Sequence, residues 1–141
     1  MGTNGNLEFN AASYYKYLAD GKIMGARCVD SGKLYVPPRQ MCPESHSTNM
    51  EWTEVSGSGK LRAFTVITVG PTAMVEAGYN FRNPYCAGIV ELEDGPSVAG
   101  QILGVDVSKP ESIKVGMAVK AKLVERGEGD DKRTYLAFEP A

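Results

Sequence analysis

The chain has 141 residues, of which 43% are hydrophobic and 23% are charged, and its formal net charge is −2. These proportions are those of an ordinary folded protein, and the length allows one core with a small appended module. The fifteen basic residues are spread along the sequence. This distribution disfavours nucleic-acid binding, because proteins that hold phosphate backbones usually carry a basic stripe.

The sequence has no stretch that approaches the roughly 20 consecutive apolar residues needed to cross a bilayer. Its polar N-terminus also lacks the basic and apolar regions of a signal peptide. We therefore expect a cytoplasmic protein with no membrane contact. Three cysteines in such a chain argue for metal binding, reactivity or packing rather than for a disulfide framework.

The single histidine, His46, restricts the chemistry that the chain can perform alone. It excludes an all-histidine metal site, and any Ser-His-Asp or Cys-His mechanism would have to use this one residue. Cys86 lies at the start of an apolar run far from His46 in the sequence, so we interpret it as a packing residue.

The first element expected in chain order is an amphipathic helix over residues 9–22. Apolar residues recur at helical spacing from Phe9 to Leu18, Asn10 is a suitable N-cap, and Gly21 is a suitable end. One interpretation is a helix that simply packs on the body of the protein.

A cluster of tyrosines on this helix supports a second interpretation. Tyr14, Tyr15 and Tyr17 cannot all face inward on one helix, so at least one is offered to a ligand or a partner. We take Tyr14 and Tyr15 as candidate contacts.

Residues 25–52 show little periodicity and many turn-forming residues, which indicates a compact module without a large core. Within this module, two four-residue segments, Cys28 to Ser31 and Cys42 to Ser45, are separated by ten residues. A zinc ribbon uses two Cys-x-x-Cys turns at such a spacing to aim four thiolates at one ion. Here each turn, or knuckle, keeps its first cysteine and has serine at the second position.

These two serines leave open whether the ribbon binds zinc. A serine hydroxyl is a poor zinc ligand near neutral pH, whereas thiolates supply much of the free energy that folds small ribbons. Cys28 and Cys42 could recruit His46 or Asp30 if the knuckle geometry shifted by one residue. The alternative is a metal-free ribbon in which the two cysteines are buried close together, since a disulfide would not persist in a reducing cytoplasm.

The rest of the chain is rich in short β-type segments separated by glycine, proline or charged turns. They are expected at Trp52–Val55, Leu61–Val69, Tyr85–Glu93, Ser97–Leu103, Ala118–Glu125 and Thr134–Phe138. Such strands without an intervening long helix fit a small closed barrel, of which the OB-fold is the commonest, although periodicity alone does not exclude a sandwich. We therefore predict a mainly β protein with an N-terminal helical segment (1–24), a degenerate ribbon (25–51) and an OB-type domain (52–141).

A series of short motifs runs along nearly the whole chain after the aromatic helix. The motifs are Arg27-Cys28-x-x-Ser31-Gly32, Leu34-Tyr35-x-Pro37-Pro38-Arg39-x-x-Cys42-Pro43, Glu51-Trp52, Val55-Ser56-Gly57-x-Gly59, Pro84-Tyr85, Val90-Glu91-Leu92-Glu93-Asp94-Gly95, Gly116-Met117-x-Val119 and Phe138-x-Pro140. Each is weak alone, but their order and spacing resemble the family of rubredoxin-like zinc-ribbon plus OB-fold proteins long catalogued as a domain of unknown function. The family pattern has four cysteines, so Ser31 and Ser45 are departures that put the zinc in doubt.

The resemblance implies a role beside thiolase-fold enzymes. Proteins of this kind are proposed to bind acyl-CoA and to act as accessory or bridging subunits for thiolases and hydroxymethylglutaryl-CoA synthases, with the partner supplying the nucleophilic cysteine and the histidines. We therefore expect a non-catalytic subunit of a hetero-oligomer. The alternatives are a free-standing acyl-CoA-binding module, then a single-stranded nucleic-acid-binding OB protein, and last an independent enzyme.

Further candidate contacts follow from this implication. The connection over residues 70–84 is long and partly apolar, so it either contacts a partner or an acyl chain, or folds over the barrel end as a plug. Its candidates are Met74, Tyr79 and Phe81. The basic residues that we would assign to coenzyme A phosphates are Arg39, Lys60, Arg62 and Arg82, each of which is also typical of a solvated surface.

Overall fold

A computed structural model describes residues 8–127 and 129–141. Its first half contains α1 (Ala11–Ala19), β1 (Met24–Cys28), β2 (Leu34–Tyr35), β3 (Met50–Glu54), β4 (Ser58–Ile67) and α2 (Thr72–Glu76). The second half contains β5 (Tyr85–Leu92), β6 (Ser97–Ile102), the short 3-10 turn η2 (Pro110–Ser112), β7 (Ala118–Arg126), η3 (Gly129–Asp131) and β8 (Arg133–Pro140). The predicted fold class, mainly β with an N-terminal helix, a ribbon and a barrel, is confirmed.

Helix α1 is shorter than the predicted segment over residues 9–22. The side chain of Asn10 accepts a hydrogen bond from the backbone N–H of Ser13 at 3.0 Å, which caps the first turn. The helix ends before Gly21, whose φ of 82° lies in the left-handed region that favours glycine. The N-terminal stretch in which we expected no signal peptide falls largely on residues 1–7, outside the described residues.

The ribbon is a three-stranded antiparallel sheet in the order β2-β1-β3. Strand β3 pairs with β1 from Met24 opposite Glu54 to Cys28 opposite Met50. The strand predicted at Trp52–Val55 therefore begins earlier and belongs to the ribbon sheet rather than to the barrel. The boundary predicted between residues 51 and 52 falls within β3, and the domain limits stay a prediction.

The second unit is a closed barrel in the strand order β4-β5-β6-β8-β7. Strands β6 and β8 pair in parallel, and β4 closes the circle by pairing with β7. Because this closing ladder runs from Ser58 to Lys60, β4 begins three residues before the predicted Leu61. Closure excludes the sandwich that the strand pattern alone left open.

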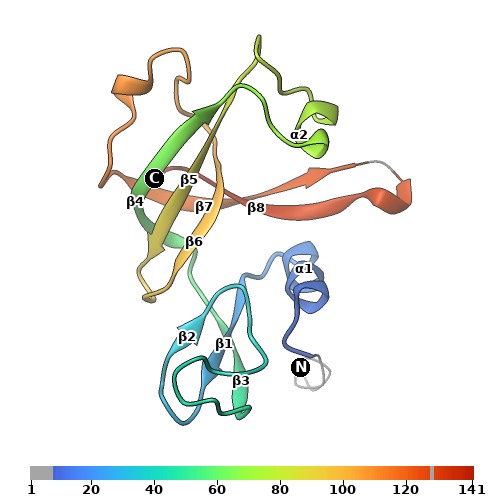
Figure 1. The fold of residues 1–141 in the computed structure, drawn as a ribbon, viewed down its shortest axis with the longest axis vertical. Coiled ribbons are helices and arrows are strands. Elements are labelled where there is room, and N and C mark those ends of the chain that lie inside the picture. Colours follow the sequence, from blue (N-terminus) through green and yellow to red (C-terminus); the bar gives the residue numbers. More distant parts are fainter. Residues whose placement is uncertain (1–7, 128) are drawn as a thin grey trace.

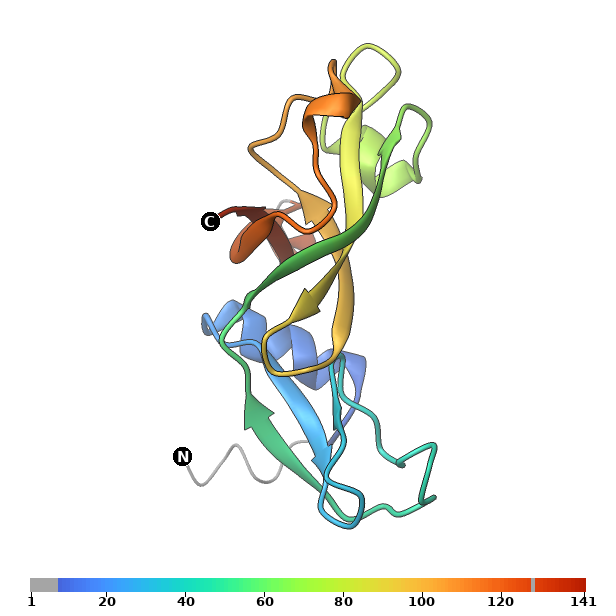
Figure 2. The same cartoon turned by 90° about the vertical axis from the view of Figure 1, so that its left-hand side faces the viewer.

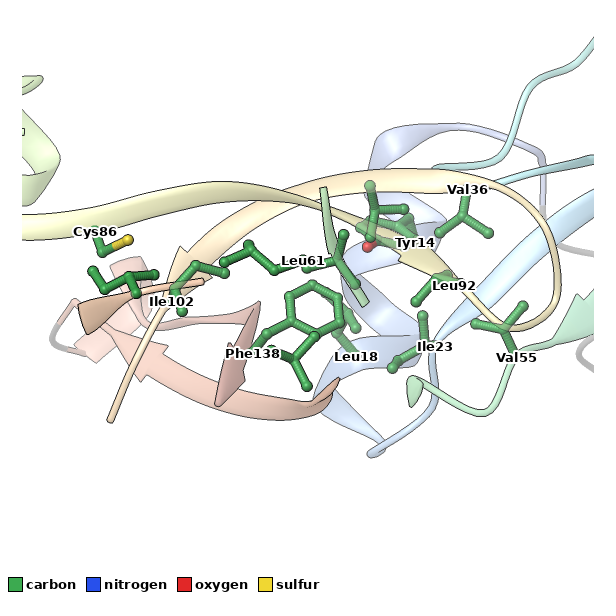
Figure 3. Close-up of a cluster of buried hydrophobic side chains, with 14 residues drawn as sticks. Tyr14, Leu18, Ile23, Val36, Val55, Leu61, Cys86, Leu92, Ile102 and Phe138 are labelled. Atoms are coloured by element: carbon green, nitrogen blue, oxygen red, sulfur yellow. The ribbon is translucent and has the colours of Figure 1, made fainter. Parts of the chain in front are cut away.

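Helix α1 lies between the ribbon sheet and the barrel in both perpendicular views (Figure 1 and Figure 2). One cluster of buried side chains joins all three parts, as the close-up shows (Figure 3). The barrel contributes Leu61 and Phe138, the helix contributes Leu18, and the segments that bound the ribbon contribute Ile23 and Val55. The ribbon is therefore packed on the barrel through a shared core. Within the described residues, no helix is long and apolar enough to span a membrane.

Gly57 joins the ribbon to the barrel in a conformation that other residues rarely adopt. Its φ is 83°, and its carbonyl accepts a hydrogen bond from the backbone N–H of Ala121 at 2.9 Å. A Cβ at this position would lie 2.7 Å from the Cβ of Ala121 and 3.0 Å from Ile23. The close approach of the two segments therefore requires glycine.

We predict that Gly57→Ala destabilises the protein more than Gly21→Ala does. Both glycines have nearly the same φ, but a Cβ at Gly21 would meet nothing within 4 Å. Gly21→Ala should cost about 1–2 kcal/mol from backbone strain, and Gly57→Ala about 1–3 kcal/mol more from overpacking. Urea denaturation of both variants measures this difference, and equal losses would show that the contact with Ala121 is unimportant.

Candidate functional site

The two knuckles of the ribbon bring their four key side chains to one centre. The Sγ atom of Cys28 lies 3.4 Å from the Oγ atom of Ser45, and the Oγ atom of Ser31 lies 3.4 Å from the Sγ atom of Cys42. Each serine thus contacts the cysteine of the opposite knuckle. The turns keep the ribbon conformation, since the backbone N–H of Gly32 donates to the carbonyl of Cys28 at 2.7 Å.

Tyr35 is an additional member of this centre that the sequence did not reveal. Its hydroxyl lies 3.3 Å from the Sγ atom of Cys42, and the backbone N–H of Ser31 donates to the Sγ atom of Cys28 at 3.3 Å. Tyr35 reaches the centre from β2, where it stands opposite Ala26 of β1. The register of β2 with β1 places Tyr35 at the centre. Its position in the sequence just after the first knuckle is the one signal that could have indicated this.

The hydroxyl groups favour the charged form of the sulfurs. Hydrogen bonds from the hydroxyls of Ser31 and Ser45, the backbone N–H of Ser45 and then the hydroxyl of Tyr35 lower the pKa of the Cys42 thiol to about 5. The pKa of Cys28 is lowered by the hydroxyls of Ser31 and Ser45. The hydrogen bond to Cys42 raises the pKa of Tyr35 to about 12, so Tyr35 keeps its proton and donates.

These residues do not fit a structural zinc ion. Their arrangement is that of a ribbon, but the donors are two sulfurs and neutral hydroxyls, whereas structural zinc sites use four thiolate or imidazole ligands. Asp30 and His46 do not complete the set: the carboxylate of Asp30 accepts from Ser47 at 2.5 Å, and in the part of the chain that the structure describes no three His, Cys, Asp or Glu residues converge on a metal position. The apparent binding energy of about 10–16 kcal/mol seen in zinc-finger peptides depends on the missing ligands.

A second candidate region is a groove between α1, the barrel wall and the long connection. This aromatic groove has a volume of about 340 Å³, and its walls include Tyr14, Tyr15, Met74, Tyr85, Tyr135, Gln101 and Arg126. It brings the adjacent candidates Tyr14 and Tyr15 together with Met74, which lies far from them in the sequence. The rings of Tyr15 and Tyr135 meet edge to face at 5.6 Å.

Arg126 lines the aromatic groove, and Arg133 lies over the ring of Tyr15, one of the groove's tyrosines. The guanidinium of Arg126 lies 5.1 Å from the ring centre of Tyr135 and donates a hydrogen bond to the side chain of Gln101. The guanidinium of Arg133 lies 4.7 Å from the ring centre of Tyr15. Sequence reasoning missed both arginines, because only the register of β7 with β8, in which Arg126 stands opposite Arg133, places them side by side.

The basic residues that we selected from the sequence do not gather at one site. Arg39 lies over the ring of Tyr35 at 5.7 Å and lines a cleft of about 550 Å³ between the ribbon and the β5–β6 turn. Arg62 pairs with Glu91 at 3.2 Å, and Lys60 is exposed on β4. The guanidinium of Arg82 lies over the ring of its exposed neighbour Phe81.

The long connection divides into a buried part and an exposed part. Met74, on α2, is buried and lines the aromatic groove, and Tyr79 packs edge to face on Tyr85 at 5.4 Å. Val75 and Phe81 remain exposed, Phe81 by 69%. Met74 and Tyr79 pack on the barrel, as the plug interpretation expects, whereas Val75 and Phe81 are exposed and their contact with a partner or an acyl chain stays a prediction.

Family models match most of the chain. The model described as "ChsH2, rubredoxin-like zinc ribbon domain" matches residues 16–51, and "ChsH2, C-terminal OB-fold domain" matches residues 52–124. The chain belongs to this family. The resemblance predicted from the ordered motifs is thereby confirmed.

Several known proteins are similar along most of the chain. A "DUF35 domain-containing scaffold protein" of Methanocaldococcus jannaschii is 34% identical over 77% of this chain and 73% of its own length. A "probable enoyl-CoA hydratase alpha subunit" of Thermomonospora curvata is 25% identical over 92% of this chain but only 37% of its own length. The solved structure "Ltp2-ChsH2(DUF35) aldolase" superposes with a TM-score of 0.73 at 24% identity, covering 96% of this chain and 97% of that one, which shows a shared fold.

We predict that wild type loses stability at alkaline pH through Tyr14 and that the Tyr14→Phe variant does not show this loss. Burial, and then the neighbouring Tyr15, raise the pKa of Tyr14 from 10.0 to about 12. Because the folded state holds the proton more tightly, this contribution is fully present below pH 10.0 and is lost as the pH rises through about 12. The free energy of unfolding can be measured by urea denaturation from about pH 8 to about pH 11. We expect that of wild type to fall by up to about 1.4 kcal/mol per pH unit more than that of the variant. A constant difference between the two proteins would contradict this.

Proposed function

We propose that this chain is a non-catalytic accessory subunit of a thiolase-fold enzyme complex that acts on acyl-CoA substrates, of the thiolase or hydroxymethylglutaryl-CoA synthase type. In this role it shapes or bridges the acyl-CoA site of its partner. The observation that carries the proposal is the likeness, over 96% of this chain, to a chain of the solved structure "Ltp2-ChsH2(DUF35) aldolase". The relatives described as scaffold proteins also support a non-catalytic role beside a catalytic partner.

The described side chains support a non-catalytic role. Covalent acyl transfer needs a nucleophile within hydrogen-bond reach of a base. All three cysteines are buried, and burial raises the pKa of the Cys86 thiol, which disfavours the reactive thiolate. His46 is exposed on the ribbon, whereas Cys86 lies inside the barrel. The chain's only histidine and the barrel cysteine therefore do not form a pair.

The exposed apolar residues of the long connection support a contact with a protein partner. Val69, Val75 and Phe81 are 86%, 51% and 69% exposed, respectively. They come from one continuous segment around α2, at the end of the barrel away from the ribbon (Figure 1). Large apolar side chains that are exposed on one segment are candidates for an interaction surface. We assign this surface to the thiolase-fold subunit.

The aromatic groove supports contact with the acyl-CoA itself. Tyrosine rings and Met74 offer apolar walls, and Arg126 offers a charge-assisted donor at the edge. This feature also favours the alternative of a free-standing acyl-CoA-binding module. A nucleic-acid-binding barrel has less support, because Lys120 and Lys122 on β7 both lie near the carboxylate of Glu139.

We predict that Phe81→Asp weakens the complex with a co-expressed thiolase-fold subunit from the same organism. A charge at this position must be desolvated when the apolar surface is covered, and removing an aromatic anchor typically costs about 2 kcal/mol or more, roughly thirtyfold in Kd. Co-purification and light scattering measure the association. The control is Ile89→Asp, which places the same charge at a 46% exposed apolar residue on the barrel wall. If wild type never co-purifies with such a subunit, the proposed function is wrong.

Calorimetry with acetyl-CoA separates the accessory subunit from the free-standing module. The accessory role predicts no measurable heat with the chain alone and binding by the complex, because the partner completes the site. The alternative predicts micromolar affinity in the isolated chain, which Tyr15→Ala should weaken by removing one wall of the groove. Micromolar binding that is the same with and without the partner would favour the alternative.

A further inference from the structure

We propose that the ribbon of this chain is closed by a metal-free network of thiols and hydroxyls, which takes the place that zinc holds in a four-cysteine ribbon. The network consists of Cys28, Ser31, Tyr35, Cys42 and Ser45, and we call it the thiol–hydroxyl network. It concerns the stability of the ribbon and does not depend on the proposed function.

The two serine substitutions form a matched pair. Four thiolates around one point repel one another and need a cation, whereas a hydroxyl is neutral and both donates and accepts hydrogen bonds. Replacing the second cysteine of each knuckle leaves two sulfurs, and each one gains a hydroxyl from the opposite knuckle. These two contacts join the knuckles across the centre in both directions without a metal ion.

Tyr35 extends the network beyond the four ligand positions of a ribbon. Its hydroxyl contacts the Sγ atom of Cys42 at 3.3 Å, so this sulfur has hydroxyl neighbours in Ser31 and Tyr35. Both cysteines have no exposed surface, and Ala26 and Met50 pack beside them. The hydrogen bonds to these sulfurs are half-buried, because Ser31 and Ser45 are themselves exposed, and removing a hydroxyl leaves a buried sulfur without that partner.

Two further polar links join the knuckles outside the buried centre. The ammonium of Lys33 lies 3.2 Å from the carboxylate of Glu44, and the hydroxyl of Ser47 donates to Asp30 at 2.5 Å. Both links connect the first knuckle to the second. They are exposed and individually weak, but they hold the same two turns that a metal would otherwise hold.

The test compares the full chain with the variant that restores the missing ligands. Wild type and S31C/S45C are produced in zinc-supplemented medium, and zinc content, Co²⁺ absorption and Tm with and without chelator are measured. We expect wild type to carry much less than one zinc per chain and to melt at the same temperature with chelator. We expect S31C/S45C to bind one zinc, to show thiolate-to-Co²⁺ charge transfer, and to lose Tm when chelator is added.

A Tyr35→Phe variant keeps the proposal testable if the cysteine variant does not fold. Tyr35 is not one of the four ligand positions. If zinc held the ribbon, Tyr35→Phe should therefore melt at nearly the same temperature as wild type. The thiol–hydroxyl network predicts a Tm lower by roughly 3–5 °C, from the loss of one hydrogen bond in a chain of this size. One zinc per wild-type chain, removed by chelator together with a fall in Tm, would overturn the proposal, as would an unchanged Tm in Tyr35→Phe.

Discussion

The structure depends on one hydrophobic core that runs from the barrel through α1 to the ribbon. Leu61 and Phe138 inside the barrel belong to the same buried cluster as Leu18 of the helix and Ile23 and Val55 beside the ribbon (Figure 3). A ribbon of about thirty residues cannot bury enough apolar surface to fold alone. Packing against the barrel supplies the buried apolar surface that the ribbon lacks. The ribbon therefore depends less on a metal than an isolated zinc module does.

This arrangement explains why the ribbon can lose half of its ligands and keep its shape. The knuckle turns are closed by backbone hydrogen bonds, and Ser31, Ser45 and Tyr35 satisfy the buried sulfurs. The same packing creates the aromatic groove, because α1 carries Tyr14 and Tyr15 against the barrel wall. The candidate surfaces of the molecule thus follow from how its small parts are packed on the barrel.

The sequence predicted most of the fold because the signals for it are local. Short alternating strands, the N-cap at Asn10 and the paired knuckles each depend on neighbouring residues, and the ordered motifs identified the family. The basic candidates did not gather at one site, since Arg39, Lys60 and Arg62 were chosen by charge without knowledge of which strands would be neighbours. Tyr35, Arg126 and Arg133 were missed for the same reason: strand register decides their positions, and it is not visible in the sequence.

We propose that this chain assists acyl-CoA chemistry without performing it. The most direct measurement is acyl-CoA turnover by the chain alone, by its thiolase-fold partner alone and by the two together. We expect no turnover by the chain alone and a change in the kcat/KM of the partner when the chain is added. Turnover at enzymatic speed by the chain alone, or a partner whose kinetics do not respond to it, would contradict the claim.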